Sequence, residues 1–245
     1  MFFIRAILVV LVAAAVARAD DAALYREGFE HFQKGEYEAA GRSLSRLAPF
    51  TQEFGEHARY LLARVHELSG ERPEAEGLYE AIIAFYGQSR SDQAPQYVTR
   101  SRFYSGRLLA QEGRYEEAAR RLSPCIAEAE GTLKDEAKLW LGVCQVKTRR
   151  FADAVTTLKA LEGDAEAQRW LARALAGSGQ MQSAIAAMRN ALVVLKSDEA
   201  RLELATLLRQ NREYQAAAEL YGAIGGELAE KAQYRRAVCQ VGDLR

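Results

Sequence analysis

The sequence predicts an all-α protein, a right-handed solenoid of six helix-turn-helix repeats with one further helix at its C-terminal end. Three observations lead to this fold class. The 245 residues include only four prolines and two asparagines and are rich in alanine, leucine, glutamate and arginine, which favour helices. Small residues recur in two columns along most of the chain. A turn-forming segment separates the two columns in each repeat.

The balance of charged residues argues against some classes of binding partner. The chain carries 33 basic and 33 acidic side chains, so its formal net charge is zero. Proteins that bind nucleic acids or anionic membranes usually present an excess of positive charge. The composition therefore gives no reason to expect a nucleic-acid partner, and 49% hydrophobic residues with 27% charged ones are ordinary for a globular protein.

Residues 1–19 are expected to form a secretory signal peptide. Arg5 precedes an apolar run from Ala6 to Ala17, and Ala17-Arg18-Ala19 provides a small-x-small cleavage site. The run is shorter than the ~20 residues that a membrane-spanning helix needs, and no later segment is apolar enough to span a membrane. We expect cleavage after Ala19 and export to the periplasm or another extracytoplasmic space. The alternative is an uncleaved N-terminal anchor.

Residues 20–226 are expected to hold the six repeats. One column of the repeat is alanine throughout, at intervals of 30 to 43 residues. Its members are Ala40, Ala75, Ala118, Ala154, Ala184 and Ala217. Mostly large apolar residues stand three positions before, four after and seven after each alanine, which traces one stripe of an α-helix. This helix is the second of each repeat.

A second column of small residues lies twelve positions before each alanine and belongs to the first helix. Its members are Gly28, Ala63, Gly106, Gly142, Ala172 and Ala205. Between the columns most repeats have glycine or asparagine, which can adopt the positive φ that ends a helix. We expect each repeat to be two helices of about a dozen residues whose backbones approach closely at the small residues.

These features resemble the tetratricopeptide repeat family over residues 22–226. The segments GEYEAA at 35–40, GRYEEAA at 113–119 and RRFADAV at 149–155 are similar to its turn and second helix. Arg149 and Arg212 stand where glycine is usual, and the frequent proline after the second helix is present only as Pro49. The resemblance implies stacked repeats whose first helices line a concave, protein-binding groove.

Three segments depart from the regular repeat. Residues 86–96 are polar and turn-rich and predict a protruding loop between the second and third repeats. The short interval around residues 161–167 predicts a tight connection. Residues 227–245 predict one more helix, either a cap with a polar outer face or the first helix of an incomplete seventh repeat. AVCQV at 237–241 echoes GVCQV at 142–146, as a first helix would. We predict a capping helix that packs on the sixth repeat, with the incomplete repeat as the alternative.

The sequence contains no recognisable catalytic or cofactor-binding motif. GxxxxGK[ST], GxSxG, HExxH and the Rossmann glycine pattern do not occur. Cys125, Cys144 and Cys239 lack disulfide or zinc spacing, so we expect buried packing roles. His31 and His66 share one repeat column and are also expected to pack. We predict a protein that is not an enzyme and binds no cofactor or metal.

The favoured function is an exported scaffold that binds a protein or peptide partner, with the oligomeric state left open. A first alternative is an architectural subunit of a cell-envelope complex that uses its edges or convex face. A second alternative is an enzyme with an unrecognised site. The fold class alone does not choose among the three.

The family resemblance also places candidate binding residues. In the family, the positions three before and one after the small residue of the first helix point into the groove. The candidates in this chain are Tyr25, Phe29, Tyr60, Arg64, Phe103, Arg107, Arg169 and Arg173. Family members that clamp a C-terminal carboxylate have asparagine at the second position, and this chain has none. We expect a groove for a segment with apolar anchors and acidic side chains. The alternative is that the arginines are solvated and the aromatics pack between repeats.

Overall fold

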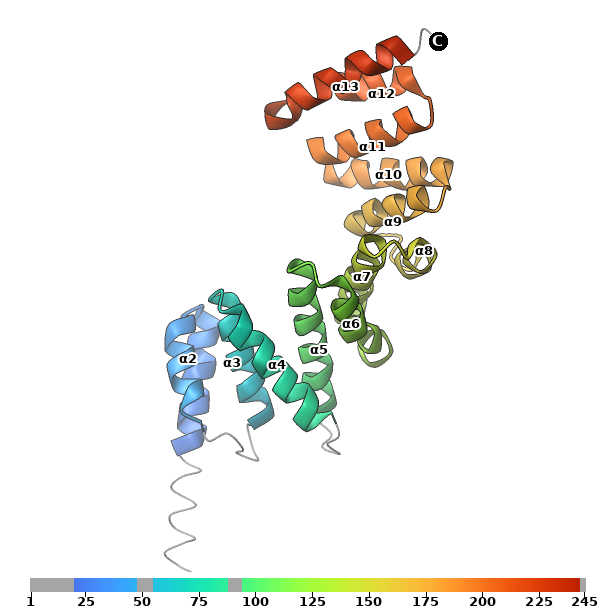
Figure 1. Cartoon of the computed structure of the whole chain (residues 1–245). Helices are drawn as coiled ribbons and strands as arrows, with labels where there is room; N and C mark the ends of the chain where they lie inside the picture. The colour runs from blue at the N-terminus through green and yellow to red at the C-terminus, as the bar shows by residue number, and fades with distance from the viewer. Residues whose placement is uncertain (1–19, 48–54, 88–93, 243–245) are drawn as a thin grey trace, which may run out of the picture. The chain divides into compact units, whose positions relative to one another are not determined.

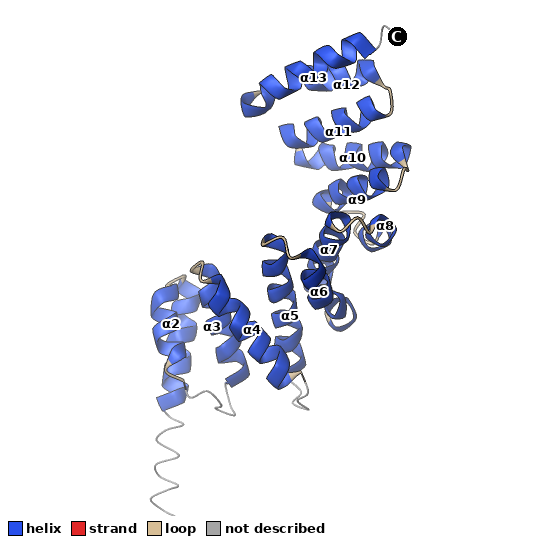
Figure 2. Ribbon diagram, in the orientation of Figure 1, coloured by secondary structure: helices blue, strands red, loops and turns tan. Residues whose placement is uncertain are grey.

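The computed structural model describes residues 20–47, 55–87 and 94–242, and every regular element in these ranges is a helix (Figure 2). The expected signal peptide, Pro49 and residues 88–93 of the expected loop lie outside the described residues. The all-α fold class is therefore confirmed for the described part of the chain.

The helices follow one another along the chain with short connections (Figure 1). Residues 20–34 form the first helix. It is followed by α2 (Tyr37–Ser45), α3 (Gly55–Leu68), α4 (Arg72–Tyr86), α5 (Ala94–Gln111), α6 (Tyr115–Glu128), α7 (Gly131–Lys147), α8 (Phe151–Lys159), α9 (Ala165–Gly177), α10 (Met181–Leu195), α11 (Asp198–Gln210), α12 (Tyr214–Gly222), the 3-10 helix η1 (Gly226–Leu228) and α13 (Ala229–Gly242).

The chain divides into two compact units. Unit 1 comprises Met1–Glu112 with Ala127–Ala129, and unit 2 comprises Gly113–Ile126 with Glu130–Arg245. In unit 1, α2 contacts α3, α3 contacts α4, and α4 contacts α5. In unit 2, the same holds from α7 through α13. Each unit is thus a row of successive helices, which is the packing expected of a repeat stack.

The six turns between the paired helices share one backbone conformation. The residue five positions before each column alanine has a positive φ. These residues are Gly35, Gly70, Gly113, Arg149, Gly179 and Arg212. Arg149 (φ 62°) and Arg212 (φ 65°) thus adopt the left-handed conformation that glycine adopts elsewhere. The repeat register is confirmed at all six turns. In the sixth turn Asn211 has φ −83°, and Arg212, which stands where glycine is usual, follows it in the left-handed region.

Hydrogen bonds explain why the same repeat position has a positive φ in every turn, whether it holds glycine or arginine. The backbone N–H of Arg150 donates to the carbonyl of Gln145 at 2.8 Å, and that of Glu213 donates to Leu208 at 2.9 Å. The turns at Gly35, Gly70 and Gly179 have the same bond. This closure satisfies carbonyls at the helix end and requires a left-handed residue immediately before the donor. The turn geometry is therefore set by the bond pattern, and arginine adopts it where glycine is missing.

The two columns of small residues lie inside the repeats as expected. All six column alanines are 0% exposed. A Cβ added to Gly28 would lie 2.6 Å from the Leu44 side chain, and one added to Gly142 would lie 2.4 Å from Leu158. Leu44 and Leu158 both stand four positions after their column alanine. The small residue of the first helix therefore makes room for a leucine of the second helix.

The apolar interior runs through each unit. In unit 1, two buried clusters form around Leu44 and Tyr79. In unit 2, a single large cluster extends from Ala154 to Cys239. Cys125, Cys144 and Cys239 are all free thiols and 0% exposed, which confirms their expected packing role. Burial raises the pKa of the Cys144 thiol to about 12, so this group stays protonated at neutral pH.

The two irregular connections have different outcomes. The expected loop over 86–96 is shorter than predicted, because α4 extends to Tyr86 and α5 already begins at Ala94. The tight connection around 161–167 is present. There the Asp164 side chain accepts a hydrogen bond from the backbone N–H of Ala167 at 2.8 Å and caps the start of α9.

The last helix, α13, packs on α12 through Ala232 and Cys239, which are both 0% exposed. Its outer face is mixed: Tyr234 is 74%, Val238 42% and Val241 58% exposed, and the polar residues expected there, Glu230, Lys231, Gln233 and Arg236, are exposed as well. The choice between a cap and an incomplete seventh repeat stays a prediction. The sequence VCQV occurs at 238–241 in α13 and at 143–146 in α7, so Val238 corresponds to Val143. Val143 is only 8% exposed. Val238 therefore occupies a position that is buried in α7 and exposed in α13.

Candidate protein-binding surfaces on the first helices

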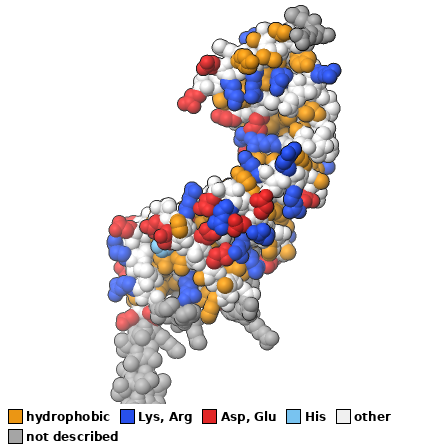
Figure 3. Space-filling model, viewed as in Figure 1, with side chains coloured by type: hydrophobic (Ala, Val, Ile, Leu, Met, Phe, Trp, Pro, Cys, Tyr) orange, Lys and Arg blue, Asp and Glu red, His pale blue; other side chains and the backbone are white. Residues whose placement is uncertain are grey.

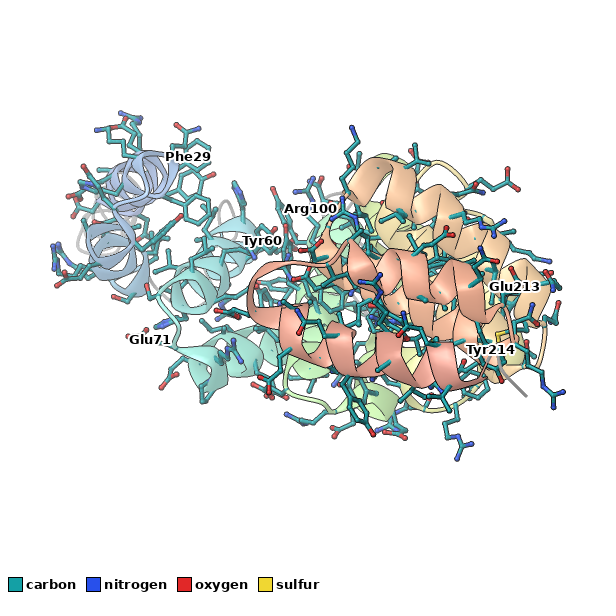
Figure 4. The ribbon with its side chains drawn as sticks, turned by 90° about the horizontal axis from the view of Figure 1, so that it is seen from above. Phe29, Tyr60, Glu71, Arg100, Glu213 and Tyr214 are labelled. Carbon is teal, nitrogen blue, oxygen red and sulfur yellow. The ribbon has the colours of Figure 1, made fainter. Side chains whose placement is uncertain are left out.

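A row of aromatic rings crosses the first helices of unit 1. This aromatic row consists of Tyr25 and Phe29 of the first helix, His57 and Tyr60 of α3, and Tyr97 and Tyr104 of α5. Neighbouring ring centroids lie between 4.9 and 6.4 Å apart. Tyr60 is buried and the other five are half-buried. Phe29 and Tyr60 lie on the same side of unit 1, away from Glu71 (Figure 4).

His57 lies at the centre of the aromatic row. Its Nδ1 is 2.6 Å from the hydroxyl oxygen of Tyr25. Burial lowers the pKa of His57, and the nearby Arg100 guanidinium lowers it further. Burial also raises the pKa of the Tyr25 hydroxyl. Both groups are therefore neutral near pH 7, and the row presents an uncharged surface.

Phe103 does not belong to this surface. It is 0% exposed, and its ring meets the Tyr104 ring edge-on at 5.0 Å between centroids. The expected groove role of Phe103 is therefore wrong, and the neighbouring Tyr104 is the half-buried ring on α5. The physical reason is that α5 turns Phe103 into the core.

Two arginines of unit 1 are held by one buried carboxylate. Glu67 of α3 has a side chain only 8% exposed. Its oxygens accept from Arg64 at 2.6 Å, from Arg107 of α5 at 2.5 Å and from the Tyr79 hydroxyl at 2.7 Å. The Arg64 guanidinium also lies 3.9 Å from the Tyr104 ring centroid. Arg64 and Arg107 are therefore not simply solvated, as the alternative expected; they form an ion cluster that joins two first helices.

Unit 2 repeats this arrangement with a different spacing. Glu203 of α11 accepts from Arg169 Nε at 2.9 Å and from Arg173 Nε at 2.9 Å, both on α9. Burial alone would raise the pKa of Glu203, but the hydrogen bonds from Arg173 and Arg169 outweigh it and hold the pKa below its ordinary value. The Arg173 guanidinium lies 4.1 Å from the Trp170 ring centroid. Each unit thus contains one carboxylate between two arginines.

A pocket of about 440 Å³ opens beside the Glu203 cluster in unit 2. We call it the α9–α13 pocket. It is lined by Ala172, Arg173 and Ala176 of α9, Met188 of α10, Leu202, Glu203, Thr206, Leu207 and Gln210 of α11, and Lys231 and Arg235 of α13. Its walls therefore combine apolar side chains with three cations and one carboxylate. Nearly all of its lining comes from first helices.

Several of these residues were not singled out from the sequence. Glu67, Glu203 and His57 are not among the binding residues predicted from the sequence. For His57 and Glu67 of unit 1, the sequence spacing could have indicated a shared helix face. His57, Tyr60, Arg64 and Glu67 follow a spacing of 3, 4 and 3 residues along α3. That spacing places all four on one helix face.

No group of three or more His, Cys, Asp or Glu side chains that could hold a metal ion occurs among the described residues. Across the same residues, no helix is both long and apolar enough to cross a membrane. The surfaces described above are instead combinations of aromatic, arginine and apolar side chains, which are the groups that dominate protein–protein interfaces.

One segment of the chain matches the model of a known repeat family. Residues 109–165 match the family model of the tetratricopeptide repeat. This segment is similar to a tetratricopeptide repeat. The matched segment runs from the end of α5 through α6, α7 and α8 to the start of α9. The comparison with curated proteins gave no match.

Solved structures show how widely this repeat fold is shared. A tetratricopeptide repeat protein from Parabacteroides merdae has a TM-score of 0.64 at 17% identity, over 92% of this chain and 93% of its own. PilW, a type IV pilus biogenesis factor, has a TM-score of 0.63 at 18% identity, over 83% and 91%. PilF of Pseudomonas aeruginosa has a TM-score of 0.62 at 18% identity, over 84% and 90%. These likenesses show that the tetratricopeptide repeat fold extends over most of the chain.

Proposed function

We propose that this protein is an exported, non-catalytic scaffold that binds a protein or peptide partner on the surface of its first helices. The observation that carries the proposal is the position of its aromatic and cationic groups. The aromatic row, both arginine–glutamate clusters and most of the α9–α13 pocket come from first helices. Aromatic and arginine side chains are the commonest anchors of protein interfaces.

The ion clusters prepare this surface for binding. Arginine side chains lose rotamer entropy when a ligand immobilises them. Arg64, Arg107, Arg169 and Arg173 are already held by Glu67 or Glu203. A partner that packs on them therefore meets a preorganised surface. The unit 1 cluster keeps one net positive charge because Arg64 and Arg107 share Glu67, whereas in unit 2 Arg169 pairs with Glu166 as well as Glu203.

Site-specific photo-crosslinking tests this function. A photoreactive phenylalanine analogue is placed at Phe29 in the aromatic row or at Leu202 in the pocket wall. Matched controls carry it at Arg42 of α2 and Glu219 of α12, which are exposed positions on second helices. In the native host we expect defined adducts from the first-helix positions alone. Equal adducts from all four positions, or none from any, would contradict the proposal.

Export is supported by the N-terminal sequence alone, through the apolar run that ends at Ala17-Arg18-Ala19. PilW is described as a type IV pilus biogenesis factor, which is compatible with an extracytoplasmic role. N-terminal sequencing of the protein expressed in a bacterial host should read Asp-Asp-Ala-Ala-Leu. An intact Met1 in a membrane fraction would instead identify an uncleaved anchor.

The architectural alternative is favoured by one observation, the exposed apolar face of α13. Tyr234, Val238 and Val241 lie together around a shallow cavity of about 420 Å³. Figure 3 shows hydrophobic side chains gathered over α13. If this face makes the main contact, a photo-crosslinker at Val238 will give adducts while those at Phe29 and Leu202 give none.

A further inference from the structure

The α9–α13 pocket carries more positive than negative charge. Arg173, Lys231 and Arg235 line it, and Glu203 is its only carboxylate. Glu203 already accepts hydrogen bonds from both Arg169 and Arg173. Among the described residues, no carboxylate forms an ion pair with Lys231 or Arg235. The pocket therefore has two cations on α13 that are free to pair with an anion from outside.

Arg235 is held in place without being neutralised. Its Nη1 donates to the Thr206 hydroxyl oxygen at 2.8 Å. Thr206 in turn donates to the backbone carbonyl of Leu202 at 2.7 Å and lies 3.2 Å from the Tyr221 hydroxyl. Arginine has five N–H donors, and this bond is the one described for Arg235. The remaining donors can form a charge-assisted pair with a carboxylate.

The rest of the pocket is apolar. Met188 is fully buried at its base, and Leu202, Leu207 and Ala176 complete the wall. A volume of about 440 Å³ falls within the range of pockets that take small ligands or side chains. A ligand that fills it must therefore bring an apolar group and an anionic group close together.

We propose that the α9–α13 pocket binds a segment of a partner protein in which an acidic side chain neighbours a large apolar one. The apolar side chain fills the wall of leucine, methionine and alanine, and the carboxylate pairs with Lys231 and Arg235. The two cations come from α13, so the pocket is complete only when α13 is packed on unit 2. This inference rests on the proposed function and specifies the chemistry of the partner.

The test uses a labelled peptide of alternating leucine and glutamate with both ends blocked, and the same peptide with glutamine in place of glutamate. The full mature chain and the variant Lys231→Ala with Arg235→Ala are titrated with each by fluorescence anisotropy. The matched control is Arg120→Ala with Lys159→Ala, two exposed cations on the second helices α6 and α8. Circular dichroism confirms that each variant is folded.

We expect the acidic peptide to bind the wild-type chain and the control variant equally. It should bind the Lys231 and Arg235 variant about tenfold more weakly or worse, and added salt should reduce the difference. The glutamine peptide should bind all three proteins weakly. Equal binding to all three proteins, or no binding of the acidic peptide to the wild-type chain, would overturn the inference. A third peptide has the same sequence but an unblocked C-terminus. If only this peptide binds the wild-type chain, the inference is also overturned.

The proposed function can survive such a result. Adducts from Phe29 report on the aromatic row of unit 1, which shares no residue with the pocket. If Phe29 gives adducts and the acidic peptide does not bind, only the pocket inference fails.

Discussion

At the scale of single residues, the turns show that a hydrogen-bond pattern can override amino-acid preference. Arg149 and Arg212 adopt φ values of 62° and 65°, although a side chain with a Cβ pays about 1–2 kcal/mol in this region. Gly35, Gly70, Gly113 and Gly179 hold the same position without that cost. The repeat therefore tolerates a local strain at two of its six turns.

Arg149→Gly should stabilise the protein. The substitution removes the left-handed strain, partly offset by the greater freedom of glycine in the unfolded chain, so we expect a gain of about 1 kcal/mol in the free energy of unfolding. Urea denaturation measures it. The matched reverse change, Gly179→Arg at the same repeat position, should lose a similar amount. A loss of stability in Arg149→Gly would show that the arginine side chain matters more than its backbone.

The alanine column gives a second prediction at this scale. Ala154 of α8 is 0% exposed, whereas Ala152 of the same helix is exposed. Ala154→Leu should overpack the contact between the paired helices and cost about 1–3 kcal/mol of unfolding free energy. Ala152→Leu is the control and should change it by less than about 0.5 kcal/mol. Equal denaturation midpoints for the two variants would contradict the register. Ala118→Leu should behave as Ala154→Leu does, because Ala118 is also 0% exposed.

At the scale of elements, successive first helices are joined by the ion clusters. Glu67 connects α3 to Arg107 of α5, and Glu203 connects α11 to Arg169 and Arg173 of α9. Their contribution to stability depends on pH. The pKa of Glu203 is lowered in the folded protein, so its share of the stability is present above the unfolded value of about 4.3 and is lost as the pH falls through the folded value.

Glu203→Gln tests this coupling. The variant keeps the side-chain size but removes the charge that holds two arginines, and we expect it to be about 2 kcal/mol less stable than wild type at pH 7. The difference should shrink between pH 5 and about pH 3, where the wild-type carboxyl becomes protonated. Urea denaturation across this pH range measures both. The exposed Glu219→Gln serves as the control, with little difference expected at any pH. A pH-independent difference would mean that packing, not charge, links α9 to α11.

At the scale of the whole molecule, the chain is two compact units of the same helical repeat, and unit 2 ends in α13. The stability of a repeat stack is approximately a sum of repeats and their contacts, so removing the last helix removes one contact surface. In α13 the inward residues Ala232 and Cys239 are small, while the larger apolar residues face outward.

Deletion of residues 229–245 should therefore lower the stability of unit 2 by a few kcal/mol through loss of the α12 contact. Hydrogen exchange should rise first in α12 and α11 and leave unit 1 unchanged. Val238→Gln is the matched comparison, because it alters only the exposed face and should leave exchange in α12 as in wild type. Unchanged protection of α12 in the deletion variant would show that α13 adds nothing to the stack.

The sequence by itself determined the helical class, the repeat register and the segment in which each repeat turns. These features depend on neighbours within one repeat: small residues twelve positions apart, an apolar stripe every three to four residues and a closing bond over six residues. Only the tertiary structure decided which side chains meet across repeats. Phe103 and Tyr104 differ by one position, so a modest rotation of α5 selects which ring is buried. Glu67 and Arg107 are 40 residues apart, and Arg169 and Glu203 are 34 apart. Such pairs depend on the rotation and spacing of separate helices, which packing sets and local periodicity does not.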